Sequence, residues 1–280
     1  MGQVAVVTDS GADLPEDVAL QHDIRLVPLR IRFGEIELTD RVELPVQEFW
    51  ARCESSRALP STAAPSIGDF VSCFEKAASD GYDAALCVTL ASKLSATHQA
   101  AEAARREVAG SVEVQVVDSA SASVGQGLLA LAAARGARDG VGLGELAERI
   151  VALAGRTFLY GTLDRLDYLH RGGRIGAVAS LVGSVLAFKP VIEVRDGAVE
   201  LVGRPRTRSR ALQTLVERAT SHGPLGSLAV VHAGAPDLAE LLSLLERAAP
   251  GIRPLVADLG PVIGTHTGPG TLGIGVQPAV

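Results

Sequence analysis

Apolar residues form two kinds of run along this chain, and the two kinds alternate through its first half. Short runs rich in Val and Ile predict strands, whereas Ala-rich stretches with apolar positions three and four residues apart predict helices. The predicted strands are residues 4–8, 24–33, 84–90 and 112–117, and the predicted helices are residues 15–21, 45–54, 67–78, 94–108, 123–138 and 143–154. Strands separated by helices of this length indicate βαβ units and a mostly parallel sheet.

The second half keeps this alternation but adds a hairpin. Its other predicted strands are residues 157–163, 228–232 and 253–259, and its predicted helices are residues 209–221 and 236–248. Residues 190–194 and 199–202 are predicted strands on either side of Asp196-Gly197, a dipeptide typical of a tight hairpin turn. An adjacent antiparallel pair indicates a mixed sheet.

The change of pattern near Gly155 and Arg156 predicts two α/β domains. Residues 1–155 are expected to form a mostly parallel, three-layer α/β/α domain, and residues 156–280 a mixed-sheet α/β domain. The length of 280 residues suits two domains, and a hydrophobic content of 47% can fill two cores. With only 4% aromatic residues, these cores must be aliphatic.

Charge and cysteine content narrow the class of protein. The net charge of −6 argues against a general affinity for nucleic acid or anionic membranes. Cys53, Cys73 and Cys87 are odd in number and lack CxxC spacing, which indicates reduced cytoplasmic thiols rather than disulfides or a zinc site. The longest nearly apolar run, residues 175–188, is shorter than the roughly 18 residues that span a bilayer. We therefore expect a soluble cytoplasmic protein without stable membrane insertion.

The segment Gly264–Gly270 is the strongest candidate for a binding site. It places His266 between two threonines, and its three glycines allow the backbone to approach a ligand closely. Residues 261–263 before it and 272–276 after it are predicted strands, so the segment is expected to be a loop that presents donors to a small anionic group. A tight turn whose histidine caps a neighbouring carbonyl is the alternative.

Three hydroxyl-rich clusters lie where predicted strands end, which is where ligands bind in open α/β sheets. The cluster from Thr8 to Asp13 suits a helix N-terminus and is interpreted as structural. Ser66 is the natural cap of the next helix, which leaves the Thr62 hydroxyl without a local role. Ser95 follows a buried strand and begins a helix, an arrangement that can bind an anion or merely cap the helix.

Common catalytic signatures are absent from the sequence. It contains no P-loop, no GxGxxG after its first strand, no GxSxG and no HExxH, so no cofactor or metal is expected. A hydrolase or acyltransferase that uses Ser95 and His266 as nucleophile and base stays open as an alternative. A transcriptional effector-binding protein lacks support, because no helix-turn-helix or basic tail is visible.

Arginines gather in two places of the second half. Arg204, Arg206, Arg208 and Arg210 alternate, and in an extended segment they would share one face, while Arg174 closes a nearby Gly-Gly turn. A positive patch on an acidic protein suggests a phosphate-bearing or acidic partner. A solvated face balanced by local acids is the alternative.

Together these segments resemble the DegV family, the fatty-acid-binding proteins that serve a bacterial fatty acid kinase (the FakB role). The resemblance spans essentially the whole chain. The matching segments are Thr8-Asp9-Ser10 through Asp13-Leu14-Pro15 (TDSxxDLP), Ser61-Thr62 through Phe70 (TSQPSxGxF), Leu90 through Thr97 (LSSxLSGT), Val117-Asp118-Ser119 (VIDS), Leu169 through Gly176 with its Gly172-Gly173-Arg174, and His266-Thr267-Gly268-Pro269-Gly270.

The resemblance implies a carrier, not an enzyme, that holds a long-chain fatty acid between its two domains. The side chains of Thr62, Ser95 and His266, with the Ala96 amide, would hold the carboxylate. Arg206 would lie at the carboxylate end and act with a separate ATP-binding kinase that forms acyl phosphate, a step in phospholipid metabolism. Further contacts with that kinase would come from Arg171, Arg174 and Arg204. The sequence departs from the family pattern at Ala63, Ala64, Ala91, Lys93 and Ala96, which bears on the shape of the pocket.

Overall fold

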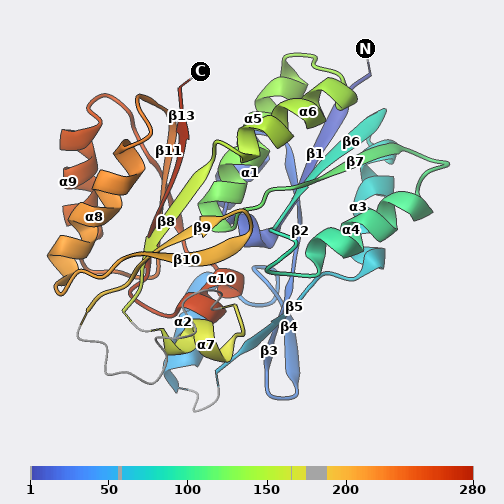
Figure 1. Cartoon of the computed structure of the whole chain (residues 1–280). Helices are drawn as coiled ribbons and strands as arrows, with labels where there is room; N and C mark the ends of the chain where they lie inside the picture. The colour runs from blue at the N-terminus through green and yellow to red at the C-terminus, as the bar shows by residue number, and fades with distance from the viewer. Residues whose placement is uncertain (1, 56–58, 165, 175–187, 280) are drawn as a thin grey trace.

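In the computed structural model, residues 2–55, 59–164, 166–174 and 188–279 are described, so nearly all of the apolar run at residues 175–188 lies outside them. Two sheets lie side by side with the long helix α5 (Ser123–Arg138) between them (Figure 1). Helix α5 contacts β1 (Val4–Asp9) of one sheet and β13 (Leu272–Pro278) of the other. The predicted class, a parallel-sheet domain followed by a mixed-sheet domain, is confirmed.

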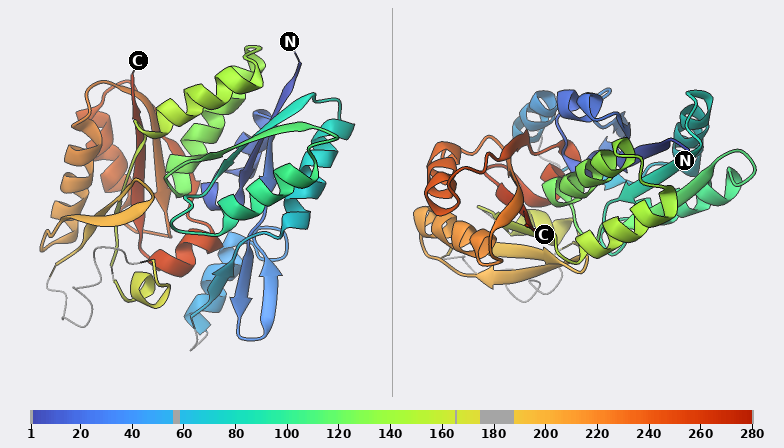
Figure 2. Two further views of the ribbon diagram at one scale, coloured as in Figure 1. Left: turned by 45° about the vertical axis from the view of Figure 1, so that its right-hand side comes forward. Right: turned by 90° about the horizontal axis from the view of Figure 1, so that it is seen from above.

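The first sheet is parallel throughout and has the strand order β2-β1-β6-β7. Strands β1 and β6 are buried at every position, which explains why their sequences are continuous apolar runs rather than alternating ones. The helices α3 and α4 cover one face, and α5 and α6 the other (Figure 2). The bounds are α1 (Glu16–Gln21), β2 (Ile24–Val27), α3 (Ile67–Ser79), β6 (Ala84–Thr89), α4 (Thr97–Glu107), β7 (Glu113–Asp118) and α6 (Leu143–Ala154).

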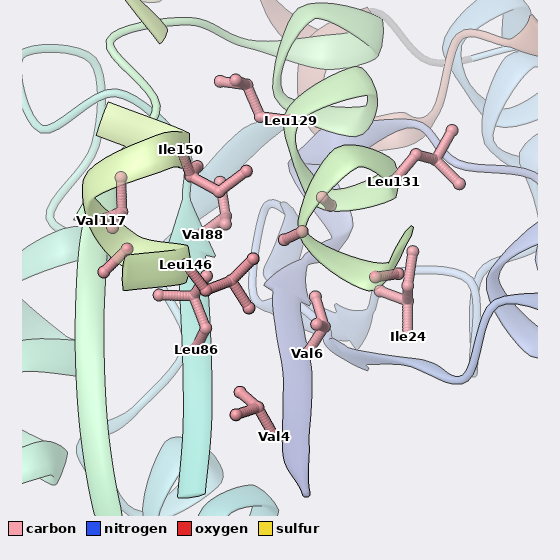
Figure 3. Packing of buried hydrophobic residues seen from close by; sticks show 14 of the residues in the cluster. Val4, Val6, Ile24, Leu86, Val88, Val117, Leu129, Leu131, Leu146 and Ile150 are labelled. Atoms are coloured by element: carbon pink, nitrogen blue, oxygen red, sulfur yellow. The ribbon is translucent and has the colours of Figure 1, made fainter. Parts of the chain in front are cut away.

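The core of this domain is aliphatic on both faces of the sheet. Val4 and Val6 of β1 lie on the face covered by α5 and α6, where Leu146 and Ile150 of α6 lie beside Leu86 and Val88 of β6 (Figure 3). The alternate residues of β1 pack toward α3 and α4. Each fully buried aliphatic side chain contributes roughly 1.5–3 kcal/mol relative to an exposed one. The sheet is therefore a firm base for the loops at its carboxyl edge.

A small antiparallel sheet, which the sequence did not predict, projects from this domain. It has the order β4-β3-β5. The prediction of one strand at residues 24–33 is wrong, because β2 and β3 belong to different sheets and Pro28 between them has no N–H for a ladder. Phe49 of α2 packs against this sheet. The bounds are β3 (Arg30–Phe33), β4 (Ile36–Thr39), α2 (Val46–Ser55) and β5 (Ser61–Ala63).

The second large sheet has six strands in the order β10-β9-β8-β13-β11-β12, of which only β11 and β12 pair in parallel. Helices α8 and α9 cover its outer face, and its inner face is turned toward α5. The predicted hairpin is confirmed, with φ of 49° at Asp196 and 73° at Gly197. The bounds are β8 (Phe158–Thr162), β9 (Val191–Arg195), β10 (Ala198–Gly203), α8 (Arg208–Thr220), β11 (Leu225–His232), α9 (Leu238–Ala248) and β12 (Leu255–Asp258).

Among the described helices, none combines the length and the apolar character that a bilayer crossing would need. Three short elements complete the fold, namely the 3-10 helix η1 (Ser10–Ala12), α7 (Asp167–Arg171) and α10 (Pro261–Thr267). The last two contact each other at the lower end of the view in Figure 1.

Candidate functional site

The His266 segment is a helix and not the predicted loop between two strands. Helix α10 begins with Pro261, whose fixed φ suits the first helical position, and ends at Gly268 with a φ of 79°. The Thr265 and Thr267 hydroxyls donate to the carbonyls four residues earlier, at 2.8 and 3.1 Å. The predicted pair of hydroxyl donors beside His266 is therefore wrong, because the helix backbone takes both.

A glycine allows this helix to lie close to α2. A methyl group on Gly264 would lie 2.8 Å from the ring of Trp50, closer than a carbon can approach. Trp50 is the only tryptophan of the chain, and it lies against α10 at Gly264, two residues before His266. Its fluorescence is therefore a natural reporter for changes at this site.

His266 contacts Thr62, which lies 204 positions earlier in the sequence. The small antiparallel sheet places Thr62 on β5, opposite Ile31 of β3, and its hydroxyl lies 2.9 Å from Nε2 of His266. Burial and, as the smaller cause, the nearby Arg174 guanidinium together lower the pKa of His266 to about 4. At neutral pH the imidazole is therefore uncharged and can offer one N–H donor.

The other imidazole nitrogen faces a backbone turn. Nδ1 of His266 is buried and has no hydrogen-bond partner within the described ranges. A methyl group on Gly172 would lie 2.2 Å from this nitrogen, so the close approach of α7 to α10 requires glycine there. The Gly-Gly of the sequence motif thus has a packing reason.

Arg174 stands beside this pair and joins two loops. Its Nε donates to the carbonyl of Leu94 at 3.1 Å, and its Nη1 donates to the carbonyl of Gly172 at 2.7 Å. The side chain is partly buried and lines the same cavity as Thr62 and His266. A positive charge, a neutral imidazole and a hydroxyl therefore gather at one place.

Ser95 and Ala96 follow Leu94 in the chain, but their side chains do not point into the cavity. The Ser95 hydroxyl lies 2.8 Å from that of Thr97 and accepts from the Thr97 amide at 3.3 Å. Ala96 is exposed at the start of α4. Leu94 lines the cavity, whereas Ser95 and Ala96 are not among the lining residues.

This geometry gives the hydrolase alternative no nucleophile and base pair. His266 is bonded to Thr62 and Ser95 to Thr97, so no hydrogen bond links the proposed nucleophile to the proposed base in the part of the chain described here. Within the same ranges, no three His, Cys, Asp or Glu side chains are arranged to hold a metal ion.

The polar groups stand at the wall of an apolar cavity between α5, α10 and the inner face of the six-stranded sheet. The cavity and its mouth, which is open to solvent, together contain about 820 Å³ of space outside the protein atoms. A sequence pattern shows which side chains point inward but not which of them surround a cavity. The apolar residues that line this one were therefore not identified from the sequence. They include Leu29, Leu90, Leu94, Leu159, Leu163, Leu169, Ile192, Val194, Val199, Val231, Leu259, Val262 and Ile263.

Asp13 ties the start of α10 to the first domain. Its carboxylate accepts from the Gly260 amide at 2.9 Å, from Arg41 at 3.0 Å and from the Ser123 hydroxyl at 2.6 Å. Burial raises its pKa, and Arg41 opposes that effect. The prediction that this cluster caps the following helix is wrong, because α1 begins at Glu16 after Pro15 and the Asp13 carboxylate holds the start of α10 instead.

The predicted arginine stripe is wrong in part. Helix α8 begins at Arg208 after the cap Thr207, so Arg208 and Arg210 are helical rather than extended. Arg208 binds Asp237 and the carbonyl of Gly270, a structural pairing. Arg206 is exposed just before the helix. Of the three arginines assigned to kinase contacts, two are also exposed, Arg171 at the end of α7 and Arg204 beside the ring of Phe188.

Comparison with known proteins matches the whole chain to one family. The family model described as "Uncharacterised protein, DegV family" matches residues 3–279. A DegV domain-containing protein of Streptomyces coelicolor is 38% identical over 278 residues, which cover 98% of each chain.

Two solved structures are similar over nearly their full length. One is described as DegV, a fatty acid binding protein from Bacillus subtilis, with a TM-score of 0.89, 30% identity and coverage of 99% of this chain and 100% of that one. The other is a stearic acid-binding protein from Eubacterium ventriosum, with a TM-score of 0.89, 27% identity and 98% coverage of both chains.

Proposed function

The chain belongs to the DegV family, and we propose that it is a carrier that binds one long-chain fatty acid in the cavity between its two sheets. The observation that carries this proposal is an apolar cavity at whose wall Thr62, Arg174 and His266 gather at one place. Two similar structures are described as fatty-acid-binding proteins, one of them as binding stearic acid.

The physical chemistry of a fatty acid fits such a site. About fourteen buried methylenes contribute on the order of 11 kcal/mol before ordering costs, so the acyl chain supplies most of the affinity. An ionised carboxylate is costly to bury without partners, and it needs several donors or a positive charge. We propose that Thr62, His266 and Arg174 supply these, with Ser95 and the Ala96 amide completing the site from the start of α4.

Purified protein is expected to carry the ligand. Organic extraction followed by mass spectrometry should return roughly one fatty acid per chain. The reason is that the free energy gained by burying the acyl methylenes exceeds the cost of immobilising the ligand. Protein that is recovered free of lipid and that also fails to bind added palmitate or oleate would contradict the proposal.

We further propose that a separate ATP-dependent kinase uses the bound carboxylate to form acyl phosphate. Acyl phosphate formation builds negative charge at the carboxylate, and the ATP phosphates must approach the same place. The exposed side chains of Arg171, Arg204 and Arg206 support this proposal, because each offers a positive charge to a phosphate-bearing partner. We also propose that the boundary between the two domains lies at residues 155 and 156. A cytoplasmic location is proposed as well, and the three free cysteines support it.

Arg206→Ala is expected to separate transfer from storage. The variant should keep its bound fatty acid, because Arg206 does not line the cavity, but acyl phosphate formation with the purified kinase should fall by about tenfold or more. Arg210→Ala, which removes an exposed arginine paired with Glu217, is the matched control and should react like the wild type. Equal rates for Arg206→Ala and the control would refute this assignment.

A further inference from the structure

The inner face of the six-stranded sheet has a bare patch where β8 and β13 meet. Gly161 and Gly273 are direct partners in the antiparallel register of these strands, and both line the cavity. A glycine in the middle of a strand weakens it, because it has no side chain to pack and loses more backbone freedom on folding. Two glycines opposite each other therefore call for a reason.

Their neighbours in the same row of the sheet carry branched side chains. Ile192 of β9 is the partner of Gly161 on one side, and Val231 of β11 is the partner of Gly273 on the other. Both of these side chains line the cavity as well. The row Ile192–Gly161–Gly273–Val231 is therefore a trough, with two bare backbones between two walls.

The described residues leave the space over Gly161 open. A methyl group there would lie 3.5 Å from the carbonyl oxygen of Leu272 and 3.6 Å from Cγ1 of Ile192, which are ordinary contacts. The next pair on the same face of these strands, Leu159 and Gly275, is different. A methyl group on Gly275 would lie 3.2 Å from Cγ2 of Val124 on α5. Helix α5 thus fills the space over Gly275, whereas the space over Gly161 belongs to the cavity.

We propose that the acyl chain lies in this trough against the bare backbone of Gly161 and Gly273, so that the residue at position 161 determines which acyl chains the protein accepts. This inference rests on the proposed function and adds a residue that sets its specificity. The close approach of a ligand to backbone is a use that only glycine allows. Gly161 is the position to test, because a methyl group on Gly273 would lie 2.9 Å from Cγ1 of Val231 and strain the sheet.

The experiment compares wild type, Gly161→Ala and Gly161→Val after removal of bound lipid, with palmitate and the shorter decanoate as probes. Valine is favoured in strands, so the fold should persist, and thermal unfolding checks this. Each added methyl takes room from the ligand, so palmitate affinity should fall in Gly161→Ala and fall by about tenfold or more in Gly161→Val. Decanoate, which has fewer carbons to place, should lose less.

A control on the same strand separates a local effect from a general one. Phe158 packs on the opposite face of the sheet and does not line the cavity, so Phe158→Leu should bind palmitate like the wild type. If both Gly161 variants bind palmitate as tightly as the wild type while remaining folded, the trough does not hold the acyl chain. If Gly161→Val does not fold, the same comparison is made with Gly161→Ala alone. If the wild type binds neither acid, the proposed function itself fails, and the inference fails with it.

Discussion

Arg174→Ala is expected to weaken fatty acid binding by about 30-fold or more, since the loss of one partner of a buried charge pair costs roughly 2–5 kcal/mol. Of the described residues that line the cavity, Arg174 alone carries a fixed positive charge, because burial and Arg174 itself keep His266 neutral. A bound carboxylate would lose its counter-charge and keep only neutral donors. Isothermal titration with oleate, or the fluorescence of Trp50, measures the effect.

Arg171→Ala is the matched control for this variant. It removes the same kind of side chain three residues earlier, at the end of α7, but Arg171 is exposed and does not line the cavity. Its oleate affinity should stay at the wild-type value. Removal of Arg174 should also raise the pKa of His266, because the guanidinium is one of the two causes that lower it. Equal affinities for both variants would show that the carboxylate binds elsewhere.

The parts of the fold that could be predicted are those in which local pattern and burial agree. Strands β1 and β6 are buried on both faces, so their uninterrupted apolar runs are unambiguous. The small sheet could not be predicted in the same way. Its strands are short, and β5 is fixed by its pairing with β3 and not by its own sequence.

Helix α10 shows why the site was only partly predictable. Glycine is a poor helix former, so Gly264 and Gly268 around His266 favoured a loop. The glycine at 264 is instead required by Trp50, a contact with a distant helix that no local pattern contains. The hydrogen bond between Thr62 and His266 joins residues 204 positions apart, so family motifs could name both residues, but spacing could not bring them together.

Arg208 shows the opposite case, in which a local signal was available. Alternating arginines share a face only if the segment is extended, and Thr207 is a typical helix cap that marks where this segment stops being extended. This cap explains why α8 begins at Arg208, whose side chain is held by Asp237.

Asp40 is a buried acid that no sequence pattern singles out. Its side chain is only 1% exposed, and neither carboxylate oxygen has a hydrogen-bond partner among the described residues. Burial raises its pKa to about 7, the Arg41 charge opposes this in part, and the charges of Asp13 and Asp9 add to it. In the unfolded chain the same group has its ordinary pKa of 3.8.

The folded protein therefore binds this proton more tightly than the unfolded chain does between about pH 4 and pH 7. The free energy of unfolding contains a favourable contribution from Asp40 that is complete below about pH 4 and is lost as the pH rises to 7. A shift of this size corresponds to roughly 4 kcal/mol. His266 acts in the opposite direction, because its lowered pKa stabilises the fold as the pH rises from about 4 to 6.5.

Asp40→Asn should remove the first contribution and leave that of His266 unchanged. The difference in the free energy of unfolding between variant and wild type then isolates Asp40, and it should shift in favour of the variant by up to roughly 4 kcal/mol from pH 4 to pH 8. Urea unfolding at a series of pH values measures this difference. Asp17→Asn, at an exposed position of α1, is the control and should show no comparable shift. If the Asp40→Asn difference does not change with pH, Asp40 has no raised pKa in the folded protein, whatever the absolute stability of the variant.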